Sequence, residues 1–199
     1  MISFKNMPDV LPYIEFENMY KKAVIKKQAS IEAVSISSWD QESCEVNSRF
    51  VNLKHINDEE WTFYSSYNGQ KMKEFANHDQ ISALFYWNSI NVQIRIKAKI
   101  FKTPSYISDN HFLNRSKEKN ALAISSMQSK EISSYEEVIE NYRKILESNI
   151  DHTKRPKYWG GLTFTPYYFE FWEGDSARLN KRRVFSKAGD SWKKYILQP

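Results

Sequence analysis

The sequence predicts a mainly β domain of the α+β class, with helices inserted between its strands, most simply a barrel with helical covers. Two observations support this. Segments rich in Val, Ile, Phe, Tyr and Trp, with a period of two, recur along most of the chain. The stretches between them carry helical spacing, and neither an internal repeat nor a Pro/Gly-rich linker is visible. With 199 residues, 41% of them hydrophobic, one domain over residues 1–199 can enclose a core.

The first thirty residues predict an N-terminal helical segment. Over residues 14–28, Ile14, Met19, Ala23 and Val24 are spaced among charged positions at roughly helical intervals, and lysines gather toward the end. From residue 31 the period changes to two, which indicates a strand over 31–39 that ends in a turn.

The middle of the chain predicts an antiparallel meander. Its expected strands are 48–56, 60–66, 81–89 and 91–103. In the last of these, apolar residues at the even positions 92–100 alternate with polar ones at 93–99, so one face should be buried and the other solvated.

Helices and closing strands make up the rest. A turn at Asn68-Gly69 opens a helical segment within 67–79, and helices are expected over 109–122 and 134–150, the latter with Ser134 as a possible N-cap. Strands should follow over 162–172, 182–187 and 191–199, with the last two joined by a hairpin turn at 188–190.

Composition excludes several classes of protein. One cysteine cannot form an internal disulfide, no leader-like or membrane-spanning apolar stretch is visible, and we expect a protein of the reducing cytoplasm. The four histidines show no metal-ligand spacing, so we expect no metal, and the five glycines form no phosphate-binding loop. Cys44 is a weak candidate nucleophile because nothing in its sequence neighbourhood would activate it.

A net charge of +5 and 15% aromatic residues leave three interpretations open. The chain could hold a flat anionic cofactor, or bind RNA by stacking on a basic surface. Alternatively, the aromatics are core and dimer interface, and the lysines are ordinary surface charges. Basic and amide side chains at predicted strand ends, such as Arg49, Lys71 and Gln93, could neutralise a phosphate and frame a heterocycle.

The C-terminal third carries a series of motifs. Residues 155–185 read RPKYWGGLTFTPYYFEFWEGDSARLNKRRVF. In this order, RP, WGG, EFW and an RLHDR-like pentad resemble the pyridoxamine/pyridoxine 5'-phosphate oxidase family. Upstream, SRFVNLK (48–54), TFYSSYNGQK (62–71), ALFYW (83–87), VQIRI (92–96) and SMQSKEI (126–132) resemble the family's preceding motifs, in register over residues 48–199.

The resemblance implies an FMN-binding split β-barrel that forms a homodimer, with FMN at the interface and residues 155–199 as a region of dimerisation and substrate contact. Lys71 would hold the FMN phosphate, with Gln70 in place of a family arginine beside it. The FMN-binding residues that the resemblance implies are Arg49, Val51, Leu53, Lys54, Tyr64, Ser65, Gln70, Lys71, Gln93, Gln128, Ser129, Trp172 and Arg182.

Substrate contacts are implied in the same way. The family's phosphate-binding Lys, Tyr, Arg and Ser match Lys54, His111, Arg115 and Lys119. In the pentad, Arg178 would cover the substrate ring, and Asn180 stands where the family has histidine, so we place these two as the catalytic contacts. Asn180 can hydrogen-bond a substrate hydroxyl or amine, but it does not titrate near neutral pH. The family's N-terminal substrate-covering Arg and Tyr are not evident in residues 1–16.

The activity implied is that of an FMN-dependent oxidase, which converts pyridoxamine or pyridoxine 5'-phosphate to pyridoxal 5'-phosphate with O2 as acceptor and release of H2O2. The partners expected are a second copy, a small anionic aromatic substrate and O2, with no nucleic acid or membrane. The changes at residues 111, 119 and 180 leave an alternative open, a paralogous oxidase of a dihydro-aromatic carboxylate of the phenazine type. A non-catalytic flavin- or RNA-binding barrel is a third interpretation, and a protein that gains no flavin absorbance on addition of FMN would exclude both oxidases.

Overall fold

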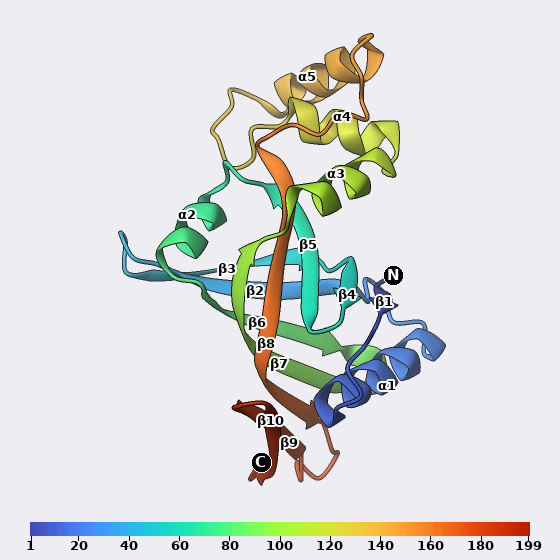
Figure 1. Ribbon diagram of the computed structural model, residues 1–199, viewed down its shortest axis with the longest axis vertical. Helices are drawn as coiled ribbons and strands as arrows, with labels where there is room; N and C mark the ends of the chain where they lie inside the picture. Colours follow the sequence, from blue (N-terminus) through green and yellow to red (C-terminus); the bar gives the residue numbers. More distant parts are fainter.

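The computed structural model describes residues 1–199 and is built around a single ten-stranded sheet (Figure 1). The strands are β1 (Ser3–Lys5), β2 (Ala33–Asp40), β3 (Glu45–Asn52), β4 (His55–Asn57), β5 (Glu60–Ser66), β6 (Gln80–Trp87), β7 (Val92–Lys102), β8 (Trp159–Glu173), β9 (Lys181–Ala188) and β10 (Ser191–Leu197). The helices are α1 (Leu11–Ile25), α2 (Gln70–Asn77), α3 (Ser105–Leu113), α4 (Lys117–Ser125) and α5 (Tyr135–Glu147), with a short 3-10 turn at Asn88–Ile90. The α+β fold predicted from the sequence is confirmed.

The long strand β8 organises the sheet. It pairs with β7 along its length, while its other edge pairs first with β5 and then, after residue 167, with β9. A register shift opposite Lys97 and Ala98 marks the change, and Pro166 lies there. Proline has no N–H to donate to a sheet ladder, so a bulge is one of the few strand positions that it fits. The first half of β8 therefore packs beside β5, and the second half beside β9.

The core lies between α1 and the inner face of the sheet. The alternation in β7 is confirmed, since Val92, Ile94, Ile96, Ala98 and Ile100 are all buried. The predicted face of the first helix is partly wrong. Ile14 and Val24 are exposed, and the helix instead buries its aromatic residues, with the Phe16 ring centroid 4.5 Å from that of Trp61. Large rings bury more apolar area than the aliphatic residues beside them, and they decide which face turns inward.

Several predicted boundaries differ in the structure. The strand expected over 48–56 is two strands, β3 and β4, separated at the fully buried Leu53 and the adjacent Lys54. The helix expected over 109–122 is also two, because Ser116 caps α4 by accepting a hydrogen bond from the Lys119 N–H. Strand β1, which pairs in parallel with β4, was not predicted. The hairpin at 188–190 is confirmed, and Gly189 there has a φ of 60°.

The elements are distributed unevenly around the sheet. Helices α3, α4 and α5 gather beyond one end, next to the start of β8 and the end of β5, whereas the β9–β10 hairpin lies at the opposite end (Figure 1). None of the helices has the length and apolar character needed to cross a lipid bilayer.

Candidate functional site

A cavity of about 1040 Å³ lies where β3 and β5 meet α2, α3 and α4. Its walls carry five cationic side chains and one carboxylate, that of Glu32. The lining residues that the sequence predicted are Arg49, Val51, Lys54, Tyr64, Ser65, Gln70, Lys71, His111, Arg115, Lys119, Gln128 and Ser129. The structure thus brings together most of the predicted contacts for cofactor and substrate phosphate, from segments up to 80 residues apart in sequence.

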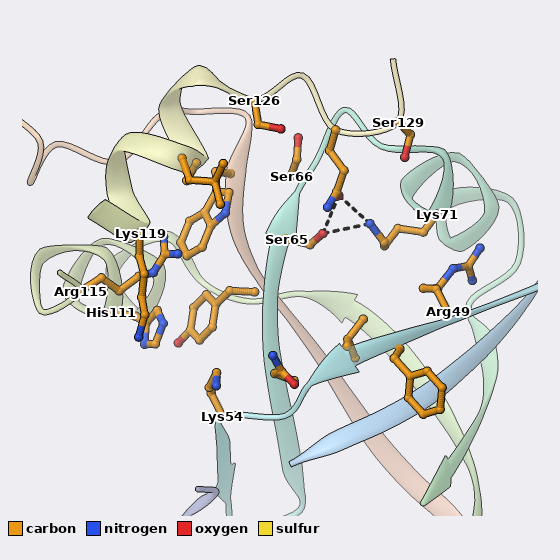
Figure 2. A pocket seen from close by; sticks show the side chains of 18 of the residues that line it. Arg49, Lys54, Ser65, Ser66, Lys71, His111, Arg115, Lys119, Ser126 and Ser129 are labelled. Atoms are coloured by element: carbon orange, nitrogen blue, oxygen red, sulfur yellow. Dashed lines mark hydrogen bonds between the residues drawn. The ribbon is translucent and has the colours of Figure 1, made fainter. Parts of the chain in front are cut away.

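One part of the wall, the Lys71 side, consists of Arg49, Ser65, Lys71 and Gln128. Lys71 lies in the first turn of α2, and only 8% of the residue is exposed. Its Nζ donates to Ser65 Oγ at 3.0 Å and to Gln128 Oε1 at 2.6 Å, and Ser65 Oγ donates to the same amide oxygen at 2.9 Å (Figure 2). Burial and the nearby Arg49 lower the pKa of Lys71. No carboxylate forms an ion pair with it, so this ammonium group is held by neutral oxygens only.

Arg49 on β3 is held differently. Its Nη2 lies 2.8 Å from Oε2 of Glu74, a fully buried carboxylate on α2. Glu74 also accepts hydrogen bonds from Ser38 and, at 3.2 Å, from Asn47 Nδ2. The charge of Arg49 is therefore already compensated within the chain, whereas that of Lys71 is not.

The opposite part of the wall, the His111 side, consists of Lys54, His111, Arg115 and Lys119 (Figure 2). The His111 ring stacks on Tyr64 with centroids 3.6 Å apart and planes 4° apart. The Arg115 guanidinium lies over the Trp159 ring at 4.5 Å. Burial, then the neighbouring His55, Arg115, Lys54 and Lys119, lower the pKa of His111 to about 4.

The His111 side also contains a contact between two histidines and a buried tyrosine hydroxyl. Nδ1 of His111 lies 3.2 Å from Nε2 of His55 on β4, so two of the four histidines that are scattered in sequence meet in space. The Tyr64 hydroxyl is buried without a hydrogen-bond partner, and burial raises the pKa of Tyr64 to about 12. A buried hydroxyl without a partner is uncommon in folded proteins, and it marks a group that a ligand can satisfy.

The remaining predicted contacts lie elsewhere. Gln93, Trp172 and Arg182 face one another in register across β7, β8 and β9. Arg178 and Asn180 are in the β8–β9 connection, where Asn180 Oδ1 accepts from the Asp175 N–H at 3.1 Å. Leu53 belongs to the core and does not line the cavity.

Distance along β8 separates this second group from the cavity. Trp159, which lines the cavity, and Trp172 are thirteen residues apart on the strand, which corresponds to roughly 40 Å of extended chain. Within one chain, no mononucleotide can touch both.

Arg182 is fixed by the acidic residue of the EFW motif, to which the sequence assigned no role. Glu170, 2% exposed, accepts from Arg182 Nε at 2.9 Å and Nη2 at 2.7 Å. The same carboxylate accepts from Arg95 Nη1 at 2.9 Å and from the Tyr168 hydroxyl at 3.0 Å. Both Arg182 nitrogens donate to the same oxygen, Glu170 Oε1, and these two hydrogen bonds set the direction of the guanidinium group.

Among the residues near the cavity that sequence reasoning missed, three hold or flank its charged groups: Trp159, His55 and Glu74. Trp159 could have been found, because it is the tryptophan of the WGG motif. His55 follows Lys54 directly, but nothing in the sequence indicates that it meets His111 on α3. Glu74 reads as one charge among several on an amphipathic helix.

Comparisons with known proteins give consistent results. The family described as "Pyridoxine 5'-phosphate oxidase C-terminal dimerisation region" matches residues 159–199. The "Pyridoxine/pyridoxamine 5'-phosphate oxidase" of Colwellia psychrerythraea is 33% identical over 84% of this chain and 77% of its own length. The protein of the same name from Haemophilus influenzae is 30% identical over 94% of this chain and 89% of its own length.

Among solved structures, PhzG from Burkholderia lata 383, in complex with tetrahydrophenazine-1-carboxylic acid, matches with a TM-score of 0.89. The match covers 96% of this chain and 94% of that one, at 23% sequence identity. At this identity the likeness establishes a shared fold.

Proposed function

The chain belongs to the pyridoxine/pyridoxamine 5'-phosphate oxidase family, and from this premise we propose that it oxidises pyridoxamine or pyridoxine 5'-phosphate to pyridoxal 5'-phosphate. Membership makes the chain an FMN-dependent oxidoreductase. The proposed acceptor is O2, with release of H2O2. The observation that carries the proposal is the buried Lys71 ammonium, held only by neutral oxygens in a wall with five cations and one carboxylate.

The residues present fit FMN. A buried cation without an anionic partner is costly, and a phosphate group supplies that partner through short, charge-assisted hydrogen bonds. Lys71 would hold the phosphate, and the hydroxyls of Ser65 and Ser129 line the same wall. Lys71 also lies in the first turn of α2, where free backbone N–H groups add positive potential.

The flavin ring needs a second set of groups, and we propose that another copy of the chain supplies them. Gln93, Trp172 and Arg182 lie roughly 40 Å along β8 from the cavity of their own chain. In a dimer with twofold symmetry, each chain would own one phosphate-binding cavity and lend this second set to its partner's cavity. All but Gln93 of the lent residues, including Arg178 and Asn180, fall within residues 159–199, the stretch matched by the dimerisation region.

Bound FMN would supply the redox chemistry, in which a hydride leaves the substrate carbon that bears the amine or alcohol and the electrons pass to O2. The residues of the chain bind and orient. Lys54, Arg115, Lys119 and His111 would hold the substrate phosphate. Arg178 would cover the substrate ring, and Asn180 would hydrogen-bond the amine or hydroxyl beside the reacting carbon.

One observation favours a second candidate, a dihydro-aromatic carboxylate of the phenazine type as the substrate. The His111 side offers four nitrogen-bearing groups of differing length, and such a set can neutralise a carboxylate as well as a phosphate. Asn180 adds no titrating group that would select an amine substrate.

A spectrum of the purified protein tests the cofactor, and a turnover assay tests the substrate. We expect flavin absorbance, either as isolated or after addition of FMN, and O2-dependent formation of pyridoxal 5'-phosphate from one or both vitamers. A protein that binds no flavin would overturn both candidates. A flavoprotein that forms no pyridoxal phosphate but oxidises a dihydro-aromatic carboxylate would support the second candidate over the first.

A further inference from the structure

We propose that His55 and His111 act as one unit that accepts a single proton when an anion binds on the His111 side, with His55 as the positioning residue that lets His111 carry the charge. The proposal rests on the proposed function only in identifying that anion with the anionic group of the substrate. His55 is absent from the cavity wall, and it acts through its partner.

Geometry defines what the pair can do. The 3.2 Å separation of His111 Nδ1 and His55 Nε2 leaves room for one shared hydrogen. Stacking on Tyr64 fixes the plane of the His111 ring, and Nε2 of His111 makes no hydrogen bond within the chain. When His111 is protonated, Nδ1–H can donate to a neutral His55, and Nε2–H remains for an anion. The face of the Tyr64 ring adds a favourable contact for the imidazolium.

The surroundings keep the pair neutral until an anion arrives. The charged groups that act on the two rings are all positive: Lys5 and Lys54 near His55, and Arg115, Lys54 and Lys119 near His111. Burial lowers the pKa of both histidines, that of His111 to about 4. Glu32 lines the same cavity, but it pairs with Lys54 at 3.8 Å. Tyr64, the remaining titratable neighbour, stays protonated at neutral pH because burial raises its pKa to about 12.

A bound dianion instead favours the protonated form of the pair. It neutralises the surrounding cations and attracts a proton to the nearest nitrogen that can take one, so the titration midpoint of the pair rises. The sign of the linkage follows. Anion affinity is weakest above the midpoint of the bound state, increases as the pH falls through that midpoint, and levels off below about pH 4, where the free pair already carries its proton.

The test uses sulfate, whose charge does not change over the range titrated, and NMR titration of the histidine ring protons in the full chain loaded with FMN. With sulfate bound, we expect the His55–His111 midpoint to rise by about one pH unit or more. A midpoint that is higher by one pH unit corresponds to roughly tenfold tighter sulfate binding by the protonated pair. The ring-proton signals of His78 and His152, which do not line the cavity, serve as internal references. A midpoint that sulfate does not move would overturn the proposal.

Two variants isolate the role of His55. His55→Phe keeps a ring but removes the acceptor for His111 Nδ1–H. Sulfate should still bind this variant near pH 8, but most of the increase in sulfate affinity at low pH should be lost. His55→Gln provides an acceptor again, the amide oxygen, and should restore the increase in sulfate affinity at low pH. Full pH dependence in His55→Phe would overturn the assigned role. Because sulfate binding requires neither turnover nor flavin, the same titration on flavin-free protein separates failure of this proposal from failure of the proposed function.

Discussion

The two sides of the cavity present cations in different ways. On the Lys71 side, Arg49 pairs with the fully buried Glu74, and Lys71 donates to the buried Ser65 and to Gln128, an exposed residue of the loop after α4. On the His111 side, His111 stacks on Tyr64 and contacts His55, and Arg115 lies over Trp159 and donates to Asn120 Oδ1 at 3.2 Å. Neither of them, nor Lys119, pairs with a carboxylate there. The first side is preorganised as part of the fold, as suits a cofactor that stays bound. The second is left adaptable, as suits a ligand that arrives and leaves.

If this comparison is correct, the largest effect on stability comes from Glu74. Glu74→Gln removes the buried charge that compensates Arg49, and we expect the free energy of unfolding of the flavin-free protein to fall by about 3 kcal/mol. Urea unfolding followed by circular dichroism measures it. Asp79→Asn is the matched control, because the Asp79–Lys99 pair is more than half exposed on both sides, and its loss should destabilise the protein far less than loss of the Glu74 charge. Equal losses in the two variants would show that the Lys71 side is not part of the core.

Lys71→Ala should affect the cofactor more than the fold. It removes the uncompensated cation, and we expect FMN affinity to weaken by about 1.5–3 kcal/mol, or roughly 10- to 150-fold. Fluorescence titration with FMN gives the dissociation constant. Lys73→Ala, at an exposed position two residues further along α2, should leave FMN affinity within about twofold. An unchanged dissociation constant for Lys71→Ala would mean that the phosphate binds elsewhere.

Arg115→Ala probes the His111 side and should have the smallest effect of the three. We expect a KM for the anionic substrate about tenfold higher, or about 1.4 kcal/mol, with FMN affinity retained. Steady-state kinetics and the FMN titration measure the two quantities. Lys117→Ala removes a cation from the exposed start of α4, outside the cavity, and provides the control. Loss of FMN affinity in Arg115→Ala would remove the distinction between the two sides.

The spacing of apolar residues predicted much of the fold. It failed where packing between residues far apart in sequence decides which side chains are buried. The alternation in β7 was sufficient to identify its buried face, because side chains of a strand alternate whatever its partners are. The face of α1 was assigned partly wrongly because Tyr13, Phe16 and Tyr20 pack against strands that lie far away in sequence. The breaks at Leu53 and Ser116 likewise depend on burial and capping that no periodicity records.

The candidate site was also predicted only in part, because some of its contacts depend on tertiary packing. Motif order placed Lys71, Arg115 and Gln128 in one cavity, but the contact between His55 and His111 depends on how α3 packs beside β4. Similarly, the motifs named Trp172 and Arg182 together with Lys71, whereas the structure shows how far along β8 they lie from it. The role of Glu170 in holding Arg182 and Arg95 also requires three strands to be aligned.

The length of β8 has a consequence for how the sequence can change. In the proposed dimer, this strand acts as a spacer between the pocket that a subunit owns and the pocket that it completes in its partner. Deleting one residue would turn every following side chain to the opposite face, and deleting two would restore the facing but shorten the spacer by roughly 7 Å. Insertions and deletions should therefore be tolerated in the loops around α5 and excluded from β8. The bulge beside Pro166 already places one extra residue in β8 relative to β7, so the facing of the second half of the strand depends on keeping that residue.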